Sequence, residues 1–320
     1  MTSLIPWVGG KGRLIPLINN LAPPKPVKFV DVFGGSGTVT LNQPLRNNCL
    51  EIYNDYNSNL TNLISCVKER PIALMKELGF LPFKSRDEFE VLKKFLSCEE
   101  FKEEYFEEEK DLAKIYFPAP EAEEIVRLMS KRRKDHDLQM AAAYFKLIRY
   151  SFSGTAKSFG CSGCDIRDFF GQIWKCSRRL RNVAIENKDY ESVIKDNDTE
   201  KSFFYCDPPY YDAEKHYEVE FREEDHVRLR NVLKSTKGYV MVSYNRCEEI
   251  LRLYEDFYII ATTRPNSLAR EKNNKYEEVI ITNYDPRKVS AQTMLGMGGA
   301  EYEFINTPKS ESNKGEENEV

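Results

Sequence analysis

Two short apolar segments on either side of a glycine-rich loop constrain the fold of this chain most strongly. Residues 27–33 (VKFVDVF) are β-branched and aromatic, and GGSG follows at 34–37. A second apolar segment, CLEIYN at 49–54, ends directly before Asp55. Short apolar runs bounded by glycine and proline are typical of buried strands. The order of strand, glycine loop, helix, strand and acid predicts the opening of a doubly wound α/β sheet.

The second half of the chain returns to the same α/β pattern. SFFYC at 202–206 and YVMVSYN at 239–245 predict buried strands, and residues 222–236 between them predict a helix. Segments 257–264 and 278–284 predict two late strands that pair as a hairpin. We therefore expect an α/β fold with a Rossmann-like sheet and helices on both of its faces.

The two α/β halves are separated by a stretch of different composition. Residues 81–125 carry 14 acids against 7 bases and have little strand character, which predicts a charged, mainly helical insertion. Residues 138–150 predict a helix, and the Ser- and Gly-rich segment 149–163 predicts a loop or hairpin. An apolar stripe at helical spacing then follows, which we expect to lie in the core and not to serve as a base-stacking platform. The stripe contains Ile166, Phe169, Phe170, Ile173, Trp174, Ser177 and Leu180.

These segments predict a domain organisation for the 320 residues. We expect one catalytic α/β domain from 1–74 and 186–305, an inserted helical and hairpin domain at 75–185, and a disordered polar tail at 306–320. The chain has no run of 18 apolar residues, so we expect no membrane span. Its eight scattered cysteines are typical of a reduced, cytoplasmic protein. The net charge of −4 argues against a protein that coats nucleic acid nonspecifically.

The glycine loop predicts a nucleotide-like ligand. Gly34, Gly35, Ser36 and Gly37 let a ligand approach the backbone, and an acid about 20 residues further on can accept both ribose hydroxyls. That acid is Asp55. The glycine spacing differs from GxGxxG, which favours an adenosine-containing cofactor other than NAD. The alternative is a plain tight turn.

A second motif follows the strand at 202–206. Asp207, Pro208, Pro209 and Tyr210 present a carboxylate, carbonyl groups and an aromatic ring at the carboxyl end of the sheet, where open α/β folds bind ligands. Two prolines end the strand abruptly and stiffen the backbone. The alternative is a strand terminator with a capping aspartate.

Taken together, four motifs resemble the adenine-N6 DNA methyltransferases of the Dam type. They are PWVGGK at 6–11, DVFGGSG at 31–37, YNDYN at 53–57 and YCDPPYY at 205–211, in the order that the family uses. The resemblance implies S-adenosylmethionine as the cofactor and duplex DNA as the substrate. It implies that the insertion at 75–185 recognises DNA.

The resemblance also implies residue roles. Lys11 would lie near the cofactor carboxylate, Asp55 would hold its ribose, and Asp189 would meet its adenine amino group with Tyr190 beside it. The residues implied to bind the cofactor are Trp7, Gly10, Lys11, Asp31, Phe33, Gly34, Gly35, Ser36, Gly37, Asp55, Asp189, Tyr190 and Asp207.

The implied catalytic residues are Asp207, Pro208, Pro209 and Tyr210. Asp207 and the Pro208 carbonyl would each accept one hydrogen of the adenine amine, and Tyr210 would stack on a base that is flipped out of the duplex. No metal is needed for this chemistry. The acid at 207 favours adenine N6. Cytosine N4, an RNA or protein substrate, and a catalytically silent DNA-binding module are the alternatives.

The DNA-facing surface is expected in the most basic stretch. Residues 126–183 carry 13 bases against 4 acids, so the acidic average of the whole chain hides one basic segment. We expect phosphate or base contacts from Lys131, Arg132, Arg133, Lys134, Arg149, Ser153 and Lys157. We also expect a cognate restriction endonuclease as a partner, and a monomer that can dimerise on DNA.

A zinc site is an alternative use of part of the same stretch. Cys161 and Cys164 form a CxxC pair, and Cys176 could supply a third ligand. The chain has no second CxxC pair, and its histidines at 136, 216 and 226 are distant in sequence. We therefore favour a flexible Ser/Gly loop over a metal site.

Overall fold

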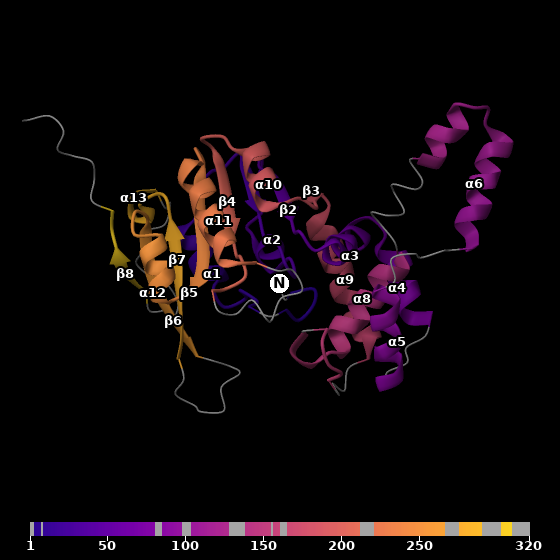
Figure 1. Ribbon diagram of the computed structural model, residues 1–320, viewed down its shortest axis with the longest axis horizontal. Helices are drawn as coiled ribbons and strands as arrows, with labels where there is room; N and C mark the ends of the chain where they lie inside the picture. The colour runs from indigo at the N-terminus through magenta and orange to yellow at the C-terminus, as the bar shows by residue number, and fades with distance from the viewer. Residues whose placement is uncertain are drawn as a thin grey trace, which may run out of the picture. The chain divides into compact units, whose positions relative to one another are not determined.

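In the computed structural model the chain forms two compact units (Figure 1). The first unit comprises residues 1–10, 35–41 and 55–187, and the second comprises 11–34, 42–54 and 188–320. The domain boundaries expected at 75 and 185 stay predictions. The structure describes residues 3–7, 9–80, 85–97, 104–127, 138–154, 156–160, 165–211, 221–265, 275–289 and 302–308.

A mixed sheet forms the core of the second unit. The described strands of this unit lie side by side in the order β2-β1-β4-β5-β7-β6-β8. The first four are parallel to one another, and β7, β6 and β8 each run antiparallel to their neighbours. The α/β fold with a Rossmann-like sheet is thereby confirmed. The strands are β1 (Lys28–Asp31), β2 (Leu50–Asn54), β4 (Ser202–Cys206), β5 (Tyr239–Asn245), β6 (Tyr258–Pro265), β7 (Lys275–Thr282) and β8 (Tyr302–Asn306).

The strand predictions hold best at the centre of the sheet. β4 and β5 have the predicted bounds, and all five residues of β4 are buried. A parallel strand covered on both faces is apolar throughout, which explains the unbroken SFFYC run. The expected hairpin is confirmed, because β6 and β7 pair antiparallel from Tyr258 to Pro265. β8 was not predicted, since its sequence YEFIN has no fully buried residue.

Helices flank this sheet. The helix expected over 222–236 is present as α11. Its first turn carries three acids, whose negative charges interact favourably with the positive end of the helix dipole. The glycine loop leads into α2 (Thr38–Asn42), of which residues 38–41 belong to the first unit. The other helices of the second unit are α1 (Ile15–Leu21), α10 (Tyr190–Asn197), α11 (Glu223–Ser235), α12 (Glu248–Leu253) and α13 (Pro286–Val289).

The first unit is built around the buried helix α8 (Leu138–Tyr150). Residues 141–148 of this helix are buried, and α3, α4 and α5 all pack against it. One of the buried side chains is Lys146, whose ammonium lies 3.6 Å from Glu88 of α5. Burial raises the pKa of Glu88, and Lys146 lowers it in part. The remaining elements are α3 (Ser58–Glu69), α4 (Pro71–Phe80), α5 (Arg86–Ser97), α6 (Glu104–Tyr116), α9 (Phe170–Leu180) and β3 (Val183–Glu186).

The apolar stripe expected on α9 is partly in the core. Ile173 and Leu180 are fully buried, and so is Ile166 in the preceding 3₁₀ turn, Ile166–Phe169. The expectation is wrong for Trp174, which is 45% exposed. It lines a surface pocket in which bases outnumber acids, with one acid, Glu69, against five bases: Lys68, Arg70, Lys76, Arg178 and Arg181. A tryptophan at the edge of an apolar helix face can pack one side of its ring against the protein while the other side stays in solvent.

The segment after α8 turns back on itself as expected. Ser151 and Phe159 form an isolated antiparallel bridge, and the Gly160 amide donates to the Tyr150 carbonyl at 2.7 Å. Gly154 in the turn has a φ of 71°, and a Cβ there would lie 2.6 Å from the Pro6 carbonyl oxygen. Within the described residues, no helix has the length and apolar character needed to cross a membrane.

Candidate active site

Asp207 stands at the carboxyl end of the central strand β4. Its Oδ1 forms an ion pair with the Lys11 ammonium at 2.7 Å. The same oxygen accepts a hydrogen bond from the Ser243 hydroxyl at 2.9 Å. Tyr205 Oη lies 2.9 Å from the same Ser243 oxygen. A serine hydroxyl has one proton, so Tyr205 donates to Ser243 while Ser243 donates to Asp207. Asp207 is thus held by a chain of hydrogen bonds that begins inside the sheet.

The electrostatic balance at Asp207 has two sides. Burial raises the pKa of its carboxyl group, whereas Lys11 and Ser243 lower that pKa. Lys11 is 2% exposed, and its ammonium also lies 4.7 Å from the centroid of the Tyr210 ring. The described part of the second unit therefore brings together three predicted site residues: Lys11, Asp207 and Tyr210.

Tyr210 is fixed at both ends. Its backbone follows Pro208 and Pro209, whose rings fix their own φ angles and so restrain the chain before it. Its hydroxyl donates to Glu278 Oε1 at 2.6 Å. Tyr210 is 3% exposed, and Glu278 on β7 is fully buried. Burial, followed by the nearby charges of Asp207 and Glu278, raises the pKa of Tyr210 far above its usual range. Tyr210 is therefore a neutral hydrogen-bond donor.

Sequence reasoning did not identify Ser243 or Glu278. Both lie in predicted strands, Ser243 as the fifth residue of YVMVSYN and Glu278 as the first residue of EVIITNY. A polar residue at a position that the strand pattern buries was the available signal. Their partners are 36 and 68 residues away in sequence, so only the sheet order reveals them.

The end of β1 carries further predicted cofactor residues of the second unit. Asp31 is buried and pairs in register with Tyr205 of β4. The Gly34 amide donates to the Asn54 carbonyl at 2.7 Å, and a Cβ on Gly34 would lie 2.2 Å from Tyr53 Cε2. Only glycine fits there, because the tyrosine ring fills the space of a side chain.

Phe33 and Tyr190, both predicted to contact the cofactor, meet in the second unit. Their ring centroids are 5.6 Å apart, and Phe221 lies 5.9 Å and 5.8 Å from the two rings. Tyr190 Oη donates to the Asp225 carbonyl oxygen at 3.3 Å. Phe221 was not among the predicted site residues, and the structure places it in this aromatic cluster.

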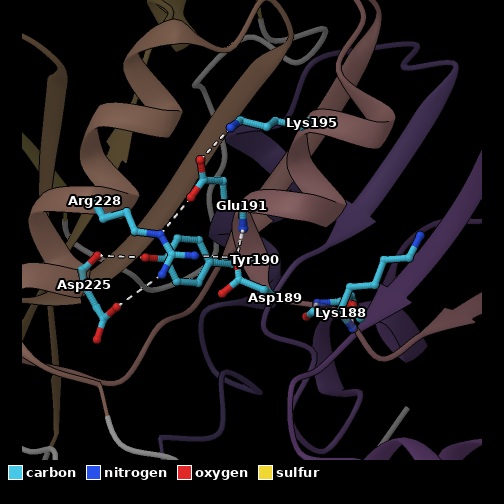
Figure 2. Close-up of polar contacts among 8 residues, drawn as sticks. Lys188, Asp189, Tyr190, Glu191, Lys195, Asp225 and Arg228 are labelled. Carbon is cyan, nitrogen blue, oxygen red and sulfur yellow. Dashed lines mark hydrogen bonds and ion pairs between the residues drawn. The ribbon is translucent and has the colours of Figure 1, made fainter.

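Asp189 is the N-cap residue of α10, and it forms an ion pair with Arg228, which the sequence analysis did not identify. Its Oδ1 accepts from the Glu191 amide at 3.0 Å, which caps the helix, and from the Arg228 guanidinium. Figure 2 shows Arg228 between the carboxylates of Asp189, Glu191 and Asp225. The guanidinium carbon also lies 4.5 Å from the centroid of the Tyr190 ring.

The first unit holds the rest of the predicted cofactor residues. The Gly35 amide donates to Asp55 Oδ2 at 2.8 Å, and the Asn57 amide donates to Asp55 Oδ1 at 2.8 Å. Gly35 has a φ of 52°, and a Cβ there would lie 3.1 Å from Trp7 Nε1. Trp7 therefore lies against a glycine backbone that has no room for a side chain. The Trp7 carbonyl accepts from the Gly10 amide at 3.2 Å, and Ser36 Oγ lies 2.7 Å from Thr38 Oγ1.

These features fit an adenosine-containing cofactor. A carboxylate has about four acceptor positions, so the chemistry of Asp55 suits the hydroxyl groups of a ribose. Among the described residues, no group of three His, Cys, Asp or Glu side chains could hold a metal ion. Cys161 and Cys164 lie outside the described residues, and Cys176 is buried.

The residues expected to contact DNA are only partly described. Lys131, Arg132, Arg133 and Lys134 lie outside the described residues, as does the side chain of Ser153. Lys157 is exposed. Arg149 donates to the Leu4 carbonyl, and its guanidinium carbon lies 3.6 Å from the centroid of the Phe169 ring. Arg149 therefore makes its described contacts within the first unit.

Comparisons with known proteins match most of the chain. The family model of the D12 class N6 adenine-specific DNA methyltransferases matches residues 7–267. The type II methyltransferase M1.LlaDCHI of Lactococcus lactis subsp. cremoris is 28% identical over 307 residues, which cover 87% of this chain and 94% of that protein. A solved structure, protein LPL1258 of Legionella pneumophila, matches 60% of this chain and 83% of its own at 13% identity, and its TM-score of 0.27 is too low to bear on the fold. The family match covers well over half of the chain, so the chain belongs to the D12 class of N6 adenine-specific DNA methyltransferases.

Proposed function

We propose that this DNA adenine methyltransferase takes its methyl group from S-adenosylmethionine and acts on a flipped-out adenine held at Asp207. The observation that carries the proposal is the geometry of Asp207. Lys11 and Ser243 both contact Oδ1, and the side chain is 20% exposed at the carboxyl end of β4. Oδ2 is therefore the oxygen that we assign to the substrate.

The residues around Asp207 explain how a weak nucleophile can react. The adenine amine is a poor nucleophile because its lone pair is delocalised into the ring. Asp207 Oδ2 accepts one amine hydrogen and the Pro208 carbonyl accepts the other, which favours a pyramidal nitrogen. The same acceptors stabilise the positive charge that develops on that nitrogen. Lys11 and Ser243 hold the carboxylate in place before substrate arrives, so little reorganisation is needed.

Tyr210 and Pro209 complete the proposed substrate site. We assign Tyr210 to stacking on the flipped base, as the family resemblance implies, and base stacking on an aromatic ring contributes about 1–3 kcal/mol per base. Pro209 stiffens the backbone between the carboxylate and this ring. Flipping is required because the amine cannot reach Asp207 from inside a duplex.

We assign residues to the cofactor from the family resemblance and from the local geometry of each unit. S-adenosylmethionine, when bound, supplies a methyl group that its sulfonium makes electrophilic. We assign its ribose to Asp55 and its methionine end to Asp31, Lys11 and the 34–37 loop. We assign its adenine to Asp189, Tyr190 and Phe33, since the aromatic cluster offers ring faces beside a carboxylate. Trp7, Gly10 and Asp207 complete the proposed set.

The proposals for the substrate and the partners rest on the charge of the segment 126–183 and on the similarity to the type II methyltransferase. The basic segment 126–183, with Lys131, Arg132, Arg133, Lys134 and Lys157, is assigned to the phosphates and bases of DNA. The relative is named a type II methyltransferase. We therefore propose that this chain protects a specific DNA sequence from a cognate restriction endonuclease. We further propose that it is a monomer that can dimerise on DNA, and that it works in the compartment that holds the DNA.

The proposal is tested by labelled methyl transfer. Duplex DNA without adenine methylation is incubated with labelled S-adenosylmethionine and with wild type, Asp207→Ala or Asp256→Ala. We expect Asp207→Ala to lose about 10²–10³-fold in rate, since it removes a preorganised acceptor of the transition state. Asp256 forms ion pairs with Arg230 and Lys234 and is not among the predicted site residues, so its variant should keep the wild-type rate. Equal rates for wild type and Asp207→Ala would contradict the proposal.

A further inference from the structure

Glu278 is a buried carboxylate for which the proposed chemistry has no direct use. It is fully buried in β7, a strand paired on both sides, with Asn245 of β5 and Thr262 of β6 as its neighbours in register. Taking a carboxylate out of water costs several kcal/mol unless hydrogen bonds compensate for it. An apolar residue would therefore pack more favourably here, which indicates that the carboxylate serves its partner.

That partner is the hydroxyl group of Tyr210. The Oη–Oε1 distance of 2.6 Å lies in the range of hydrogen bonds from a hydroxyl to a charged oxygen. The backbone of Tyr210 is restrained by Pro208 and Pro209, and the far end of its ring is restrained by Glu278. A phenol side chain has two rotatable bonds, so restraint at both ends leaves the ring one orientation.

We propose that Glu278 is a positioning residue, which orients the Tyr210 ring toward the target adenine. This inference rests on the proposed function of Asp207 and Tyr210. Lys11 offsets the charge of Asp207, because its ammonium contacts that carboxylate at 2.7 Å, and the same ammonium lies 4.7 Å from the Tyr210 ring centroid. Glu278 acts through Tyr210 and does not touch the reacting atoms.

Three variants test this role: Glu278→Ala, Tyr210→Phe and the double variant. Each single change removes the same hydrogen bond, so we expect each to lower the single-turnover methylation rate about tenfold. The double variant should be no slower than the slower single one, because residues that act as a unit are not additive. The dissociation constant for S-adenosylmethionine should stay unchanged, which a general loss of structure would not allow.

Two further variants control the experiment. Glu278→Gln keeps an acceptor oxygen and should restore most of the rate, and it also serves if Glu278→Ala does not fold. Glu277→Gln changes the adjacent acid of β7, which is exposed and pairs with Arg246 at 3.1 Å, and it should keep the wild-type rate.

The outcomes separate the inference from the function on which it rests. Multiplicative losses in the double variant, or a wild-type rate in Glu278→Ala, would overturn the positioning role while leaving methylation intact. A wild-type chain that transfers no methyl group to DNA would overturn the proposed function and the inference with it. The expected pattern of equal single losses, a non-additive double variant and rescue by glutamine would support both.

Discussion

Two charge networks of the second unit pair a base with carboxylates, and they differ in burial. Lys11 and Asp207 have side chains that are 2% and 20% exposed, and their ion pair is 2.7 Å long. Arg228 and Asp189 are 43% and 35% exposed. A buried pair strongly constrains its members, because breaking it leaves an uncompensated charge, whereas an exposed pair can open at little cost. We infer that the first network fixes the reacting group and that the second can yield to a ligand.

The largest expected effect comes from breaking the buried pair. Lys11→Met leaves the Asp207 carboxylate without its cation, so we expect the free energy of unfolding to fall by about 3 kcal/mol. Urea denaturation measures this loss. Lys195→Met is the matched control, since Lys195 pairs with Glu191 at 2.6 Å but is 68% exposed. Similar losses in the two variants would remove the distinction between the networks.

The same variant should change the pH dependence of catalysis. Burial raises the pKa of Asp207, and Lys11 lowers it. Without Lys11 the pKa rises further, so the carboxylate that we propose as the acceptor of the amine hydrogen is protonated at a higher pH. We expect the acidic limb of the single-turnover rate profile to move to higher pH in Lys11→Met. A limb that stayed in place, or moved to lower pH, would show that Asp207 is not the titrating group.

The smallest expected effect belongs to the exposed network. Arg228→Met removes contacts to Asp189 at α10, to Glu191 and to Asp225, yet we expect a loss of less than about 1 kcal/mol. The loss should shrink at high salt, because exposed charges are screened. Urea denaturation at low and high salt measures both. A larger loss that did not depend on salt would show that Arg228 is as tightly bound as Lys11.

Local sequence patterns predicted the parts of the fold that local chemistry determines. The strands at 202–206 and 239–245 were predicted with their observed bounds, because each short apolar run ends directly before a charged residue, Asp207 or Arg246. β8 was missed because its residues are only partly buried and it pairs with β6, far away in sequence. Trp174 was misplaced because spacing identifies a helix face but not where that face meets solvent.

The candidate site shows the same division. Lys11, Asp207 and Tyr210 were predicted from motifs, and the structure brings them together. Ser243, Glu278 and Arg228 were not predicted, since each depends on a partner in another element. Sequence motifs thus predicted the groups proposed to touch the ligands, and only the structure revealed the residues that hold those groups.

The most direct test of the account is the identity of the methylated nucleoside. DNA is incubated with the wild-type chain and labelled S-adenosylmethionine, digested to nucleosides and separated by chromatography with mass detection. The account predicts that the label appears in N6-methyladenine alone. Label in N4-methylcytosine, or unlabelled DNA, would contradict it.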